Sequence, residues 1–91
     1  GGSLWLNLDG RIDASGSTSL RFAIMRAFPE HNSIVLNMEK VPAITSAGIR
    51  VLQFGKKTAD SQKGRLMLIN PNPMVRDALR VTGMDKLLDI R

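Results

Sequence analysis

The sequence predicts a single α/β domain in which helices pack on a mostly parallel central sheet. Short apolar segments rich in strand-forming residues alternate with segments whose apolar residues recur every three or four positions. Turn residues separate each strand-like segment from the helix-like segment that follows, and this order is typical of parallel sheets. The 91 residues are enough for one domain with one modest core.

The first half of the chain holds two predicted strands and one predicted helix. Leu4–Leu8 alternates in part and predicts a strand in which Trp5 is packed. The helix caps available at Asp13–Ser17 precede a helical pattern over Thr18–Phe28. The run Ser33–Met38 is almost continuously apolar, so we expect a central strand covered on both faces.

The second half repeats the alternation. A helix is expected over Ser46–Ser61 and is closed by Lys63-Gly64 in the manner of a glycine cap. Arg65–Ile69 predicts another buried strand, and Met74–Val81 predicts a third helix. The apolar tail Leu87–Ile90 must dock on the rest of the domain. No internal repeat or second domain is expected.

Composition narrows the classes of function. Gly1–Ser3 is interpreted as a linker remnant outside a domain that spans Leu4–Arg91. The net charge of +5 permits acidic partners, but the basic residues are scattered and tyrosine is lacking, so direct nucleic-acid binding is not expected. The chain has no cysteine and no apolar run near the roughly 20 residues of a membrane span. These features favour a cytoplasmic location without membrane insertion.

The sequence carries little that suggests catalysis. His31 is the single histidine, and the carboxylates are dispersed without an acid/base pair or a metal cluster. No phosphate-binding loop or dinucleotide fingerprint is present. We therefore expect no enzyme, no catalytic residue, no cofactor and no metal. The methionines Met25, Met38, Met67 and Met74 lie in or beside apolar segments and are expected to fill the core.

The turn Thr45-Ser46-Ala47-Gly48 is the most informative feature, because it joins a strand to the start of a helix. Unpaired N–H groups and the helix dipole favour negative charge at such a position. A hydroxyl here could cap the helix or carry a phosphate. Glycine in a first helical turn costs about 1 kcal/mol relative to alanine, which suggests close packing at Gly48, against a partner or against the domain itself.

Several segments of the chain together resemble one family. They are Leu8–Asp13, Ser33–Met38, Val41–Ile49, Gly64–Asn70, Val75–Leu79 and Thr82–Leu88. Their order and spacing strongly resemble the STAS domain family, typified by bacterial anti-sigma factor antagonists, over residues 6–90. The resemblance implies a STAS-like fold, and also a strand before Leu4 and a helix after Arg91 that this stretch of sequence does not contain.

The resemblance also implies a partner switch. In the antagonist branch, a serine at the start of the second main helix is phosphorylated by a kinase that is itself the anti-sigma factor, and a phosphatase resets the switch. Ser46 matches that phosphoacceptor, and Asp13 matches an acidic residue near it. The expected partner-binding surface consists of Asp13, Thr45, Ala47, Gly48, Ile49 and Arg50.

Three alternatives to this interpretation stay open. The family commonly places an aspartate directly before the serine, whereas this chain has Thr45, which adds a competing hydroxyl. A STAS domain also serves in anion transporters and in lipid-transport complexes, where the partner is a membrane transporter. The basic composition and Thr45 fit that reading too. Ligand sensing in a larger signalling scaffold is a third role, and no pocket motif supports it.

Overall fold

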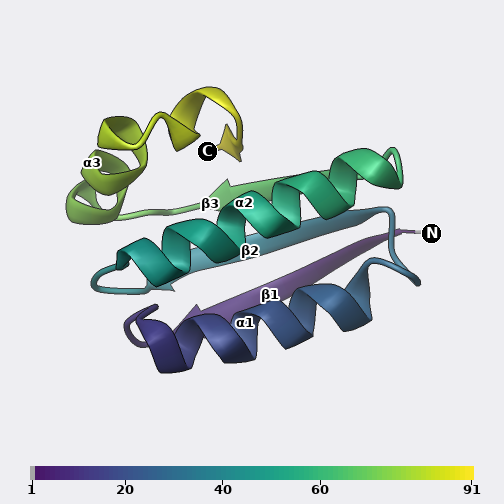
Figure 1. The fold of residues 1–91 in the computed structure, drawn as a ribbon, viewed down its shortest axis with the longest axis horizontal. Helices are drawn as coiled ribbons and strands as arrows, with labels where there is room; N and C mark the ends of the chain where they lie inside the picture. The colour runs from purple at the N-terminus through teal and green to yellow at the C-terminus, as the bar shows by residue number, and fades with distance from the viewer. Residues whose placement is uncertain (1) are drawn as a thin grey trace.

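The computed structural model describes residues 2–91, and Gly1, a part of the predicted linker, lies outside the described residues. The predicted α/β alternation is confirmed (Figure 1). The elements are β1 (Ser3–Asp9), α1 (Ala14–Ala27), β2 (Ser33–Lys40), α2 (Ser46–Ser61), β3 (Arg65–Ile69), α3 (Pro73–Val81), the short 3₁₀ helix η1 (Met84–Lys86) and β4 (Asp89–Ile90). The apolar tail docks through β4, which pairs with β3.

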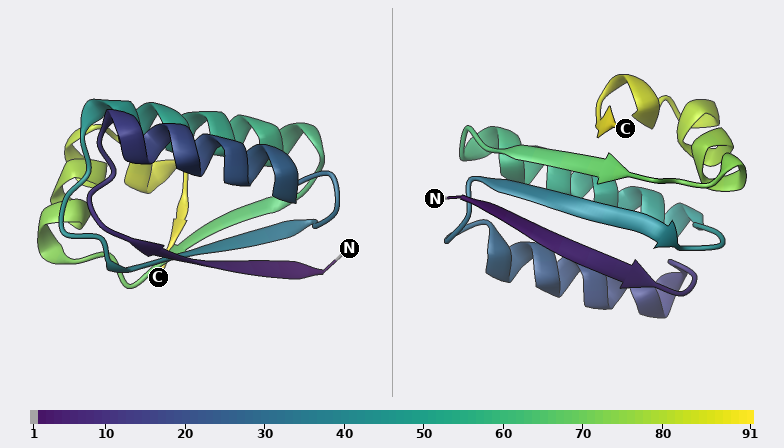
Figure 2. Two further views of the ribbon diagram at one scale, coloured as in Figure 1. Left: turned by 90° about the horizontal axis from the view of Figure 1, so that it is seen from below. Right: turned by 180° about the vertical axis from the view of Figure 1, so that it is seen from behind.

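The four strands form one parallel sheet in the order β1-β2-β3-β4. Because β-α-β crossovers are right-handed, a strand order that runs in one direction places successive helices on the same face. Figure 2 shows α1 and α2 together on one side of the sheet, and no element within residues 2–91 covers the other side. The expectation that the central strand is covered on both faces is therefore wrong.

The core lies between the sheet and this helical layer. Ile34, Leu36 and Met38 of β2 point into it and are fully buried. The predicted inner faces of the helices meet them there, with Ile24 of α1 and Leu52 of α2 completely buried. The predicted helical periodicity is thus confirmed by packing.

Trp5 lies on the uncovered face of the sheet and is 59% exposed, so the expectation that it is packed is wrong. Alternate residues of a strand point to opposite faces, and in β1 the leucines at positions 4, 6 and 8 take the inner one. Trp5 stands in register with Val35 of β2 and Met67 of β3. The three residues form one row across the outer face.

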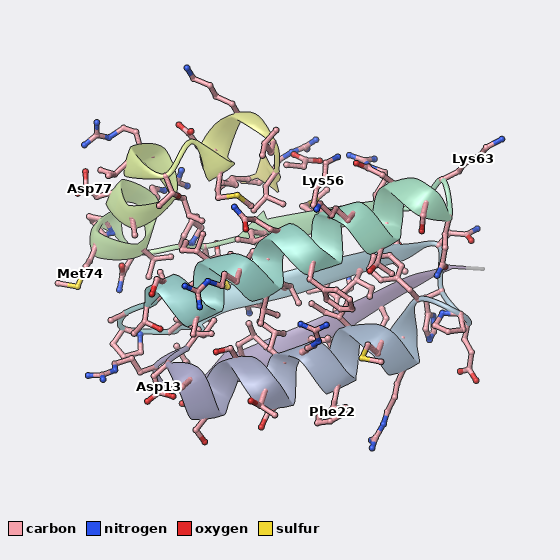
Figure 3. The ribbon with its side chains drawn as sticks, in the orientation of Figure 1. Asp13, Phe22, Lys56, Lys63, Met74 and Asp77 are labelled. Atoms are coloured by element: carbon pink, nitrogen blue, oxygen red, sulfur yellow. The ribbon has the colours of Figure 1, made fainter. Side chains whose placement is uncertain are left out.

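Core filling by methionine holds for Met38, which is fully buried, but not for the other three. Met67 is half-buried on the outer face of the sheet, in the row with Trp5. Met25 is 49% and Met74 is 67% exposed. Met25 directly follows the inward-facing Ile24, and Met74 directly precedes the inward-facing Val75. The turn of each helix therefore points the methionine outward. Figure 3 shows Met74 pointing away from the domain.

Two helices begin earlier than their apolar patterns indicate, because a side chain caps each start. Asp13 accepts a hydrogen bond from the Gly16 N–H at 3.0 Å, so α1 starts at Ala14 rather than Thr18. Asn72 accepts one from the Val75 N–H at 2.8 Å, and α3 starts with proline in its first turn.

The end of α2 uses a different residue from the one expected. Lys63, not Gly64, adopts the left-handed conformation, with φ of 56°. The Gly64 N–H donates to the Ala59 carbonyl and the Lys63 N–H to the Asp60 carbonyl, which is a Schellman pattern. Gly64 is needed for space, because a Cβ there would collide with the backbone oxygen of Asn32.

We expect Lys63→Gly to raise the free energy of unfolding by about 0.5–1 kcal/mol, because glycine relieves the left-handed strain of a lysine. Gly64→Ala, one position on, should lower it by about 1–3 kcal/mol, because a backbone oxygen cannot move aside. Urea unfolding of both variants measures the two effects. Equal changes of the same sign would contradict this assignment of the cap.

Candidate functional site

The predicted site lies at the carboxyl-terminal edge of the sheet, where three loops are joined by hydrogen bonds. The Ile12 N–H donates to the Ala43 carbonyl at 3.1 Å, which ties the loop before α1 to the loop before α2. The Asn72 side-chain amide donates to the Val41 carbonyl at 3.2 Å and so adds the loop before α3. The middle loop, which carries the serine turn, is therefore held from both sides.

Thr45 is the N-cap residue of α2, but its side chain makes no capping hydrogen bond. Its backbone N–H and its hydroxyl both donate to the Ile12 carbonyl, at 3.0 and 3.2 Å. The hydroxyl is thus half-buried and engaged by a residue far away in the sequence. Thr45 fixes the start of α2 against the start of α1.

Ser46 is the first residue of α2 and is exposed. Its hydroxyl takes part in no hydrogen bond within residues 2–91, so it does not cap the helix. The first turn of α2 contains no acidic side chain. The N–H groups at the start of the helix therefore present an uncompensated positive end beside a free hydroxyl.

Gly48 is buried against the domain itself. A Cβ at this position would lie 2.8 Å from the backbone oxygen of Ile12 and 2.5 Å from Cγ1 of Ile44. Ile49, the next residue, is only 7% exposed and belongs to the core. These two members of the predicted partner surface are therefore corrected: they shape the turn from inside and do not present a surface to a partner.

Asp13 lies at the start of α1, at the end of the domain where α2 also starts (Figure 3). The hydrogen bond from the Gly16 N–H lowers the pKa of its carboxyl below the usual value, and the charge of Arg11 lowers it further. The side chain is therefore a charged helix cap. The role that the structure shows for this side chain is structural.

Arg50 and Ala47 complete the predicted set and line a shallow, open hollow of about 230 Å³ between α1 and α2. Arg50 is exposed, and Ala47 is half-buried. Arg21 of α1 lines the same hollow and stacks over the ring of Phe54, with its guanidinium carbon 4.3 Å from the ring centre. Sequence reasoning missed Arg21, because only the packing of α1 against α2 brings it near the turn.

Residues 2–91 hold neither a candidate metal site nor a candidate membrane-spanning helix. No group of three or more histidine, aspartate or glutamate side chains in residues 2–91 could hold a metal ion. His31 is half-buried in the loop between α1 and β2, away from the turn. No helix within these residues is both long enough and apolar enough to span a membrane.

Comparison with known families decides the classification. The model of the STAS domain family matches residues 1–91. The chain is a member of the STAS domain family. The predicted resemblance is confirmed, and it places the serine turn at the second main helix of a STAS domain.

Solved structures share the fold of this STAS domain. TM1081 from Thermotoga maritima superposes with a TM-score of 0.90 at 21% identity, over 97% of this chain and 77% of that one. The anti-sigma factor antagonist SpoIIAA in its unphosphorylated form gives a TM-score of 0.85 at 22% identity, over 99% and 80%. The phosphorylated form of SpoIIAA from Bacillus gives 0.75 at 21% identity, over 98% and 82%. At these identities the likeness establishes the fold.

A different class of protein matches by sequence. High affinity sulfate transporter 1 of Stylosanthes hamata is 26% identical over an alignment 99 positions long, which covers 96% of this chain. The match covers only 15% of that transporter's length. This chain is therefore similar in fold to solved anti-sigma factor antagonists and in sequence to a part of a sulfate transporter.

We expect Gly48→Ala to lower the free energy of unfolding by about 1–3 kcal/mol, because the added methyl group meets the Ile12 backbone. Ser46→Ala, two residues earlier in the same turn, removes only an exposed hydroxyl and should change it by less than about 0.5 kcal/mol. Thermal or urea unfolding compares the two variants. A stable Gly48→Ala domain would show that the turn can move away from Ile12.

Proposed function

We propose that this STAS domain is an anti sigma factor antagonist-like module that switches partners when Ser46 is phosphorylated. Its partners would be an anti-sigma factor that is also a serine kinase, and a phosphatase that resets the switch, all in the cytoplasm. The domain would bind rather than catalyse. The observation that carries the proposal is the exposed, unbonded Ser46 hydroxyl on the first turn of α2.

A structural relative supports phosphorylation as the chemistry of the switch, and the contacts of this chain support the choice of Ser46. SpoIIAA has the same fold and has been solved in a phosphorylated and an unphosphorylated form. The two hydroxyls of the turn differ in this chain, because that of Thr45 donates to the Ile12 carbonyl whereas that of Ser46 is free. Phosphorylation of Thr45 would break a contact that holds the start of α2. Ser46 can accept a phosphate without such a loss.

Electrostatics indicates where the phosphate acts. A phosphate on Ser46 adds a charge of about −1.5 to −2. At the start of a helix, negative charge is stabilised by about 0.3–1 kcal/mol, so the phosphorylated domain stays folded. The phosphate instead destabilises the complex with the partner, because it is desolvated or repelled in the interface. A loss of about 4 kcal/mol corresponds to roughly a thousandfold in affinity.

Phosphorylation assays with the cognate kinase test the proposal. We expect one phosphate on the wild-type domain and on Thr45→Val, and none on Ser46→Ala, when intact masses are measured after incubation with ATP. Thr45→Val is the matched control, since it removes the neighbouring hydroxyl and keeps the shape of the side chain. Equal incorporation into Ser46→Ala would exclude Ser46 as the acceptor.

A second candidate is a STAS domain that serves an anion transporter or a lipid-transport complex. It is favoured by the similarity to sulfate transporters and by Thr45, which stands where antagonists commonly carry an aspartate. In that role the domain would contact a membrane permease constitutively, and Ser46 would be an ordinary surface residue.

Affinity purification of the tagged protein from its own cells separates the two candidates. The transporter role predicts a stable complex with a permease that Ser46→Asp leaves unchanged. The partner-switching role predicts a kinase as the main partner, and loss of that complex in Ser46→Asp.

A further inference from the structure

We propose that the hollow between α1 and α2 docks an acidic segment of the partner through Arg21 and Arg50, and that phosphate on Ser46 closes this site by capturing Arg50. The first part rests on the charges and contacts of the helical layer. The second part rests on the proposed function, because it requires a phosphate at Ser46.

The surface formed by α1 and α2 is almost purely basic. Within residues 14–27 and 46–61, the basic side chains are Arg21, Arg26, Arg50, Lys56 and Lys57. Asp60 is the single acidic side chain of these two ranges, and it is paired with Lys56 at 3.0 Å. The charged cap residue Asp13 lies just before α1 and next to Ala14 of the hollow, and it reduces the excess of basic over acidic side chains from four to three. The surface therefore still attracts carboxylates overall.

Arg21 and Arg50 are not paired with carboxylates, whereas several other arginines are. Arg65, Arg80 and Arg91 each form an ion pair with an aspartate. Across residues 2–91, no carboxylate oxygen lies within ion-pair distance of Arg21 or Arg50. Both guanidinium groups are therefore available to a ligand, and stacking on Phe54 limits the freedom of Arg21.

The hollow between α1 and α2 suits an extended segment of a partner chain rather than a bulky side chain. Small side chains from both helices line it: Ala14 and Ser17 from α1, and Ala47 and Val51 from α2. Such residues let a partner backbone or a short acidic side chain approach closely. The two arginines, one from each helix, can then pair with carboxylates of the same segment.

A phosphate on Ser46 would compete for one of these arginines. Ser46 and Arg50 are four residues apart in α2, so their side chains lie on the same face of the helix. An acidic group placed four residues before a basic one is the favoured order in a helix. Arg50 would then pair with the phosphate, and the docked carboxylate would lose its partner and meet a like charge.

A short polyglutamate peptide serves as the acidic probe, and amide chemical shifts of the ¹⁵N-labelled domain report where it binds. We expect shifts to concentrate around the hollow. The double variant Arg21→Gln/Arg50→Gln should weaken binding about tenfold, since each exposed ion pair is worth up to about a fivefold change. The control Arg26→Gln/Lys57→Gln removes the same charge from the same helices outside the hollow and should retain most of the affinity.

The phosphate arm uses protein with phosphoserine installed at position 46 during translation, so that no kinase is needed. Phosphoserine at 46 should weaken peptide binding at least fivefold and shift the Arg50 Nε–H signal. Phosphoserine at Ser61, at the other end of α2, adds the same charge and should do neither.

Shifts spread evenly over all basic residues, or equal losses in the two double variants, would overturn the docking site. Unchanged binding by the protein phosphorylated at Ser46 would overturn the capture of Arg50. If kinases ignore Ser46 while the peptide still binds the hollow, the proposed function fails and the acidic docking site stands.

Discussion

The candidate site depends on one backbone oxygen, the carbonyl of Ile12. It accepts hydrogen bonds from both the N–H and the hydroxyl of Thr45, so the chain entering α2 is fixed to the chain entering α1. The two segments approach so closely that only glycine fits at position 48. Ser46 is therefore placed by backbone contacts and not by its own side chain, which leaves its hydroxyl free. A functional residue on a rigidly held turn is the arrangement expected of a recognition site.

The strand order has an equally direct consequence for function. Since the helices follow one another on a single face, α1 and α2 lie side by side (Figure 2), and Arg21 and Arg50 line one hollow between them. The opposite face of the sheet has to remain compatible with water. It does so partly through a ladder of amides, in which Asn37 bonds Asn7 at 3.0 Å and Asn70 at 3.2 Å. Such satisfied polar groups let a parallel sheet keep one face uncovered, an uncommon arrangement.

Local pattern predicted α2 and β3 to the residue, because periodicity and turn residues agreed there. Local pattern gave wrong or incomplete predictions where the placement of a side chain depends on contacts between residues far apart in the sequence. Trp5 has a side chain typical of the core, yet its strand parity points it outward. The difference between Thr45 and Ser46 could not be predicted from the turn itself, because the partner of Thr45 is Ile12, on a segment before another helix. Gly48 signalled close packing, and only the fold shows that the packing is internal.

The charge of the domain limits how a phosphate could act. A net charge of +5 becomes about +3 on phosphorylation, so the domain stays basic overall. Salt screens interactions between exposed charges beyond about 8 Å at physiological ionic strength. A change in the overall field is therefore too weak to switch a partner. The phosphate must act on groups within about one helical turn, which is about 5.4 Å along the axis. Arg50 lies one turn from Ser46, so the switch and the arginine that it would control belong to the same turn of α2.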